Sequence, residues 1–215
     1  LIESSKKALE NVLEKISNSE KISTNEIGKI IQETISSHGF KPIVNLSGHS
    51  MEQYVLHAGI SIPNISSQEG RVLTPGLYAV EPFATNGNGK VKNGKPSGVY
   101  ELINTKNTRN PFARELLDFI VEEYNQLPFC SRWLVKKFGT KALFGLKQLE
   151  DNGNLHQFPQ LVESSNKKVA QSENTLLLEK DKVTVHKTTS LPAQHLKTHE
   201  YPGFITDLQA PMTLL

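Results

Sequence analysis

Two histidines, His49 and His57, stand eight residues apart in a stretch whose glycines indicate loops and short strands. A glycine beside an imidazole, such as Gly48, keeps the backbone slim, so a ligand can approach the ring closely. This spacing therefore allows one or both rings to bind a ligand. It also allows two surface histidines that only form local hydrogen bonds, which is the more frequent arrangement.

Two glutamates stand beside apolar strands. Glu81 interrupts such a strand, and the alternation of side chains places it on the same face as Leu77 and Ala79. A buried carboxylate is costly unless a charge or a metal compensates it. This break in polarity therefore favours a site over an edge-strand glutamate that faces water. Glu173 precedes the apolar run 175–178, where a glutamate in a helix cap or turn is an equally good explanation.

One histidine and the two glutamates together form a set of nitrogen and oxygen donors. Such donors suit hard or borderline divalent ions, namely Mn, Fe, Co or Zn. A metal held by carboxylates polarises a carbonyl and lowers the pKa of bound water, which is the chemistry of metal-assisted hydrolysis. Spacing alone makes His49, Glu81 and Glu173 a candidate hydrolytic site, and it leaves the structural explanations above open.

Two amphipathic helices are predicted ahead of these residues. In residues 1–17, apolar side chains recur every three or four positions, with Lys and Glu on the opposite face. A second helix begins at Ser23, which forms a capping box with Glu26, and it ends at Gly39. Each helix has one apolar face, so both need a layer of other elements to cover it.

The candidate site residues fall among short predicted strands. Glycines and prolines punctuate residues 41–81. Strands are predicted at 77–83, 99–105, 175–178 and 182–186. Residues 86–98 are expected to form a turn-rich hairpin, and the last two strands are expected to pair through a turn at 179–181.

A helical block separates the third of these strands from the second. Pro111 can begin a helix, and two further short helices are predicted at 131–138 and 141–150. Three short helices followed by a strand pair resemble a winged-helix unit. Such units often bind DNA, but this one lacks a clustered basic helix, so no DNA partner is expected. Residues 190–215 contain three prolines and no periodicity, which indicates an irregular tail.

The composition of the 215-residue chain argues against several other classes of protein. A net charge of +2 does not suit a dedicated nucleic-acid binder. No apolar run approaches the roughly 20 residues that span a bilayer and no signal peptide is visible, so no membrane partner is expected. The only cysteine, Cys130, allows no intrachain disulfide and suits a reducing compartment. A cytoplasmic location is therefore expected.

Four longer motifs connect these features to a family. The chain resembles the type 2 methionine aminopeptidases, in their archaeal form, over residues 1 to about 188. The resemblance lies in the segments NLSGHSMEQYVLHAGISIPN, GLYAVEPFATNGNG, LPFCSRWL and VAQSENTLLL. It implies the α+β pita-bread fold, here partial, with parts of the catalytic domain at 1–106 and 159–189. Residues 107–158 would be the winged-helix-like insertion of the type 2 enzymes, and 190–215 a tail of unknown origin.

The resemblance also implies an activity and a role for each site residue. The family removes the initiator methionine from nascent proteins and peptides, using two divalent metals (Co, Mn, Fe or Zn) bridged by water or hydroxide. His49 would bind one metal. Glu81 would bind the same metal and shuttle the proton of the nucleophilic water, and Glu173 would bridge both metals. His57 would contact the substrate carbonyl and stabilise the oxyanion, and Leu56 would line the methionine pocket. The ribosome is a further implied partner.

The chain departs from the family pattern in two ways. Asn174 replaces the histidine that usually follows the last glutamate. Two aspartate ligands and a further histidine are expected upstream, yet no aspartate precedes Asp118, and His38 matches no motif. At most one metal would then be well coordinated, and the chain alone is expected to be an inactive carboxyl-terminal portion of the enzyme. The alternatives are one subunit of a split aminopeptidase, which needs a second chain, and a non-catalytic pita-bread binding protein.

Overall fold

The computed structural model describes residues 1–179 and 183–186, which form two compact units. Unit 1 consists of Leu1–Lys92 and the described residues from Leu161 onward, and unit 2 consists of Asn93–Gln160. The predicted insertion, 107–158, falls within unit 2, whereas the predicted tail, 190–215, lies outside the described residues. Among the helices described, none combines the length and the apolar character that crossing a membrane requires.

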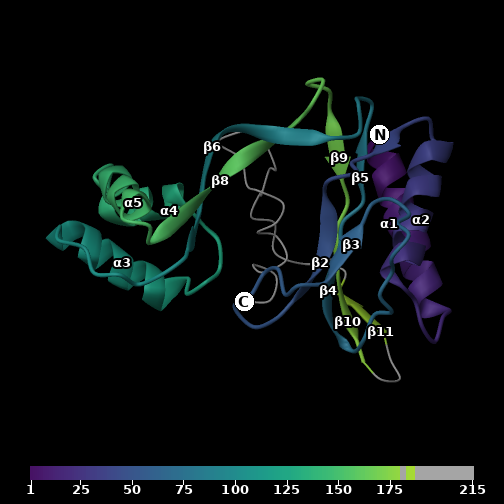
Figure 1. The fold of residues 1–215 in the computed structure, drawn as a ribbon, viewed down its shortest axis with the longest axis horizontal. Coiled ribbons are helices and arrows are strands. Elements are labelled where there is room, and N and C mark those ends of the chain that lie inside the picture. The colour runs from purple at the N-terminus through teal and green to yellow at the C-terminus, as the bar shows by residue number, and fades with distance from the viewer. Residues whose placement is uncertain (180–182, 187–215) are drawn as a thin grey trace. The chain divides into compact units, whose positions relative to one another are not determined.

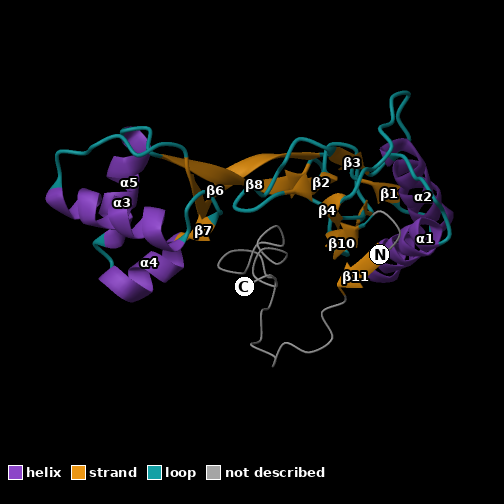
Figure 2. Cartoon of the chain, turned by 90° about the horizontal axis from the view of Figure 1, so that it is seen from below, coloured by secondary structure: helices purple, strands orange, loops and turns teal. Residues whose placement is uncertain are grey.

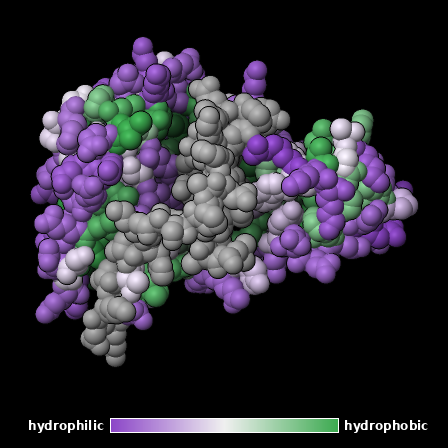
Figure 3. Space-filling model, turned by 180° about the vertical axis from the view of Figure 1, so that it is seen from behind, coloured by the Kyte–Doolittle hydropathy of each residue, from purple (hydrophilic) through white to green (hydrophobic). Residues whose placement is uncertain are grey.

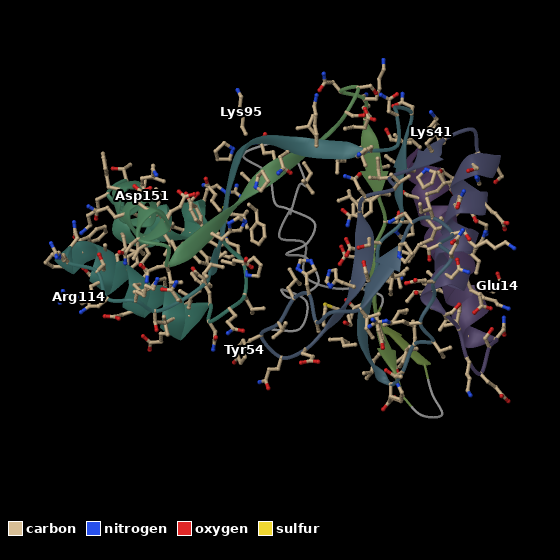
Figure 4. The ribbon with its side chains drawn as sticks, in the orientation of Figure 1. Glu14, Lys41, Tyr54, Lys95, Arg114 and Asp151 are labelled. Atoms are coloured by element: carbon tan, nitrogen blue, oxygen red, sulfur yellow. The ribbon has the colours of Figure 1, made fainter. Side chains whose placement is uncertain are left out.

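Unit 1 begins with two amphipathic helices, α1 (Ile2–Ser17) and α2 (Thr24–Ser37). Their apolar faces pack against each other and against the strands (Figure 1). The capping box predicted for the second helix is present, since the Glu26 N–H donates to the Ser23 hydroxyl and the Glu26 carboxylate accepts from the Ser23 N–H. Figure 4 shows Glu14 of α1 on the outer side of this helical layer, away from the strands.

Eight short strands of unit 1 form two antiparallel sheets. The five-stranded sheet has the order β11-β10-β4-β2-β3 and the three-stranded sheet the order β1-β5-β9. The strands are β1 (Lys41–Pro42), β2 (Ser47–Met51), β3 (Ser61–Pro63), β4 (Gly76–Val80), β5 (Phe83–Thr85), β9 (Val169–Gln171), β10 (Asn174–Leu178) and β11 (Val183–His186). The predicted pairing of the last two strands is confirmed, and most of the turn predicted between them lies outside the described residues.

The register of the five-stranded sheet brings distant parts of the sequence together. β4 lies between β2 and β10, so Ala79 is opposite His49 on one side and opposite Thr175 on the other. Asn174, the first residue of β10, is opposite Val80. The sheet therefore carries three sequence-distant segments to one place near the end of β4.

The strand predicted over 77–83 is wrong in one respect, because the chain leaves one sheet and enters the other at Glu81 and Pro82. β4 ends at Val80 in the five-stranded sheet, and β5 begins at Phe83 in the three-stranded sheet. Proline has no N–H to donate to a ladder, which explains why pairing stops there. The break places Glu81 at the junction of the two sheets rather than within a strand.

Unit 2 contains three helices and most of a third sheet. The helices are α3 (Pro111–Glu123), α4 (Ser131–Phe138) and α5 (Ala142–Asp151), close to the predicted positions (Figure 2). α3 begins with Pro111 at its first turn, and the Asn110 side chain accepts hydrogen bonds from two of the free N–H groups. Buried leucines, alanines and one isoleucine from the three helices pack with the buried rings of Tyr100 and Phe129 and form a core of their own. Figure 3 shows mostly hydrophilic side chains on one face of each unit, with hydrophobic ones in smaller areas.

The prediction of a hairpin at 86–98 and a separate strand at 99–105 is wrong. Residues Val91–Leu102 form one long strand, β6, which pairs with β7 (Phe129–Cys130) and β8 (Leu155–Glu163). Gly98 has a φ of +79°, a conformation that glycine adopts readily, so it acts as a local irregularity and does not end the strand. The Ser97 hydroxyl donates to the Phe158 carbonyl and accepts from the Val99 N–H, which bridges the irregular position.

Candidate functional site

The site is built around a buried pair, His49 on β2 and Glu81 after β4. The His49 Nε2 and Glu81 Oε1 atoms lie 3.2 Å apart, and the two side chains are only 8% and 2% exposed. The sheet register explains the proximity, because β2 and β4 are neighbours and Ala79 is opposite His49. The burial of Glu81 removes the alternative of an edge-strand glutamate that faces water.

The second predicted glutamate, Glu173, reaches the same place through an amide. The Gln171 Nε2 donates to the Glu81 Oε2 at 2.7 Å and to the Glu173 Oε2 at 3.3 Å. The two carboxylates therefore share one amino group. Glu81 is 90 residues from Gln171 in the sequence, whereas Glu173 is only two residues away. His49, Glu81 and Glu173 are thus brought together, with Gln171 as a member that the sequence did not indicate.

The second histidine is also part of the cluster. The ring centroids of His49 and His57 lie 4.3 Å apart, with the rings at 65° to each other. Leu56, the residue before His57, is buried, with 7% of its surface exposed. The structure therefore places the ring of a second, exposed imidazole beside the buried His49, and the residue before it, Leu56, is part of the core.

The loop that carries His57 is fixed by backbone hydrogen bonds. Glu52 and Val55 exchange both of their backbone hydrogen bonds around a tight turn, and the Ala58 N–H donates to the Ser50 carbonyl. Tyr54 occupies the turn with a φ of +61° and is half exposed, and Figure 4 shows it at the far end of the loop. The loop returns the chain to β2, which is why residues eight positions apart can meet.

A buried amide, Asn64, fixes the backbone on both sides of Pro82. Its Nδ2 donates to the carbonyls of Leu46 and Glu81, each at 3.1 Å, and its Oδ1 accepts from the Phe83 N–H at 2.7 Å. Asn64 is fully buried. Sequence reasoning missed this residue, because nothing but its place in the motif NLSGHSMEQYVLHAGISIPN sets it apart from other asparagines.

The glycine beside His49 has a function in addition to the predicted one. A Cβ atom at Gly48 would overlap the carbonyl oxygen of Ala79 on the neighbouring strand. The missing side chain is therefore required for the close approach of β2 and β4 rather than only for the approach of a ligand. This contact keeps His49 close to the strand that ends at Glu81.

The donors of the cluster fit a divalent metal ion in kind and partly in spacing. Two donors that lie about 2.1 Å from one ion are roughly 3.0 to 3.4 Å apart, and the His49–Glu81 distance of 3.2 Å falls in this range. Both atoms are of the type that Mn, Fe, Co and Zn accept. The Gln171 amide links the Glu173 carboxylate to Glu81 of this pair. Within the part of the chain that the structure describes, no group of three or more His, Cys, Asp or Glu side chains converges into a complete metal site.

Two proteins of similar sequence from archaea are methionine aminopeptidases. The chain is 41% identical over 186 residues to the methionine aminopeptidase of Methanocaldococcus jannaschii, and 44% identical over 184 residues to that of Thermococcus onnurineus. These alignments cover 86% and 84% of this chain but 62% of each relative, so the chain spans less than two thirds of their length. No family model matches the chain.

Solved structures show the same fold at lower identity. A thermophilic Arx1 superposes with a TM-score of 0.63 at 19% identity, covering 75% of this chain and 45% of that one. A methionine aminopeptidase from Thermotoga maritima superposes with a TM-score of 0.50 at 19% identity, covering 86% and 49% of the two chains. These similarities confirm the predicted α+β, pita-bread fold class.

Proposed function

Since this chain is a homologue of the methionine aminopeptidases, we propose that it contributes His49, Glu81 and Glu173 to a metal-dependent site. This site removes the amino-terminal methionine from nascent proteins and peptides. The observation that supports the proposal is the buried His49–Glu81 pair at the end of β4, which the Gln171 amide links to Glu173. The sequence similarity supports the choice of substrate and of reaction.

His49, Glu81 and Glu173 have different roles in the proposed hydrolysis. His49 Nε2 and Glu81 Oε1 would hold one divalent ion, and the Glu173 carboxylate would be shared with a second. A divalent ion in this place would polarise the scissile carbonyl and lower the pKa of bound water. The Glu81 carboxylate accepts the proton of the attacking water and passes it to the leaving amino group.

His57 and Leu56 act on the substrate. The His57 imidazole lies beside His49 and donates a hydrogen bond to the carbonyl oxygen on which negative charge develops. Leu56 contributes an apolar surface next to that histidine, which suits the side chain of an amino-terminal methionine. The rest of the ligand set comes from aspartates outside this sequence, in the same polypeptide or in a second chain. The ribosome and its nascent chains are the partners that this activity implies.

An experiment that tests the proposal adds residues of a relative to this chain. Residues of the Methanocaldococcus jannaschii relative that lie outside the region of similarity, and that carry the two aspartates implied by the family resemblance, are fused ahead of Leu1. Methionine release from a Met-Ala-Ser peptide is then measured with Co²⁺ or Mn²⁺. We expect turnover by the fusion and none by the 215-residue chain alone. Glu81→Ala should lower turnover of the fusion by at least about a thousandfold, since it removes a ligand and the proton acceptor.

The matched control is Glu69→Ala, which removes an exposed carboxylate of the same unit and should leave turnover unchanged. A fusion that releases methionine equally well without the Glu81 carboxylate would contradict the proposed site. A folded fusion that binds the peptide but never releases methionine would support the alternative of a non-catalytic binding protein.

A further inference from the structure

Gln171 occupies a fixed position between the two sheets of unit 1. It is the last residue of β9, where its backbone is opposite Phe83 of β5. The next residue, Ser172, donates its N–H to the Pro82 carbonyl and shares a hydrogen bond with the Ser5 hydroxyl of α1. The main chain around Gln171 is therefore held by contacts that do not involve its side chain.

The side chain of Gln171 is used for a different purpose. Its amino group donates to Glu81 Oε2 at 2.7 Å and to Glu173 Oε2 at 3.3 Å. A glutamine amino group has two hydrogens, so each carboxylate receives one. Two carboxylates that approach each other repel, and a neutral donor shared between them offsets part of that repulsion without introducing a positive charge that would compete with a cation.

The hydrogen bond to Glu81 also decides which way that carboxylate faces. The terminal torsion of a glutamate side chain has a broad energy minimum, so its hydrogen-bond partners determine its orientation. Because Gln171 takes Oε2, the other oxygen, Oε1, is directed to His49 Nε2 at 3.2 Å. The Gln171 amide thus contributes to the orientation in which the spacing suits two ligands of one ion.

We infer that Gln171 is a positioning residue that presets Glu81 and Glu173 for a divalent cation and so sets the affinity of the site. The role rests on the proposed function, because it requires that these carboxylates bind metal. Gln171 acts through the two glutamates and contacts neither the reacting atoms nor the cation. Substitutions one contact beyond a metal ligand typically lower metal affinity by about 10- to 100-fold.

The test is a titration of the full 215-residue chain with Co²⁺, in which visible absorption and calorimetry monitor binding. Gln171→Leu should weaken Co²⁺ binding by about 10- to 100-fold. It should also change the absorption spectrum at saturating Co²⁺, because the carboxylates no longer keep their orientation. The matched control is Gln32→Leu, which removes another glutamine hydrogen bond in unit 1, to the Ser66 N–H. It should leave both the affinity and the spectrum unchanged.

The melting temperature distinguishes a role in metal binding from a purely structural role. It should change little in Gln171→Leu, because the backbone contacts of the strand remain. If that variant melts much earlier, Gln171→Met is used instead, since methionine keeps the length of the side chain without its donors. Equal Co²⁺ affinity and an identical spectrum in the folded variant would overturn the role of Gln171. An unsubstituted chain that binds no Co²⁺ contradicts the proposed metal site itself, and the role of Gln171 with it.

Discussion

At the scale of single residues, the site combines side chains that sequence patterns can indicate with others that they cannot. His49, His57, Glu81 and Glu173 were predicted because a charged or titratable group beside glycine or within an apolar run is conspicuous. Gln171 and Asn64 are ordinary amides, and their importance comes from what they touch. A buried amide is conspicuous only once the backbone groups and carboxylates around it are known.

Glu163 shows how a buried carboxylate can serve structure rather than chemistry. Burial raises the pKa of its carboxyl, but this effect is outweighed by hydrogen bonds from the Ser165 hydroxyl and from the N–H groups of Lys167, Ser165 and Asn88. Together these bonds lower the pKa from 4.5 to about 2. The carboxylate thereby joins the loop after β5 to the turn after β8.

The lowered pKa of Glu163 predicts a specific pH dependence of stability. A group whose pKa is lower in the folded state stabilises the fold above its unfolded-state pKa and loses that contribution as pH falls toward its folded-state pKa. Between about pH 5 and pH 2, the free energy of unfolding of the natural chain should therefore fall more steeply than that of Glu163→Gln. Urea denaturation across this range measures the difference.

The control for this prediction is Glu69→Gln, at an exposed position in the same unit. Its stability should follow the pH dependence of the natural chain. Parallel curves for the natural chain and Glu163→Gln would mean that the hydrogen bonds to Glu163 do not stabilise its ionised form.

At the scale of elements, local patterns predicted the helices well and the strands less well. The apolar periodicity and the Ser23–Glu26 capping box are local signals, so α1 and α2 were predicted close to their observed bounds. The change of sheet at Pro82 and the length of β6 depend on partners far along the chain, such as Asn64 and Phe158. A glycine-rich segment in a long strand cannot be told from a hairpin without those partners.

The contact of β2 with β4 gives a prediction at this scale. Gly48→Ala would force a methyl group into the Ala79 carbonyl, so the two strands must separate. We expect a loss of about 1–3 kcal/mol in the free energy of unfolding. Gly76→Ala is the control, because a Cβ there meets the Tyr78 ring at an ordinary 3.5 Å, and it should cause no loss. Chemical denaturation measures the free energy of unfolding of both variants. Equal stability of Gly48→Ala and Gly76→Ala would contradict the close approach of β2 and β4.

At the scale of the whole molecule, the described residues divide into two units that each bury a core of their own. All the proposed catalytic residues belong to unit 1, so residues near 50, 80 and 173 lie in one compact unit, while the three helices between them in the sequence belong to the other. The order of motifs in the sequence indicated this arrangement, although the places where the chain passes between the units could not be derived from it. The chain spans 62% of the length of its archaeal relatives, so its site is proposed to be completed by residues outside this sequence.

The most direct test of this account is the dissociation constant of the chain for Co²⁺, measured by calorimetry before and after removal of one imidazole. We predict that the natural chain binds Co²⁺ and that His49→Ala weakens binding by at least about tenfold, since even groups beyond the ligands change affinity by this much. His38→Ala, which removes an exposed histidine at the end of α2, should bind as the natural chain does. Equal affinity of the natural chain and His49→Ala would contradict the assignment of this cluster as a metal site.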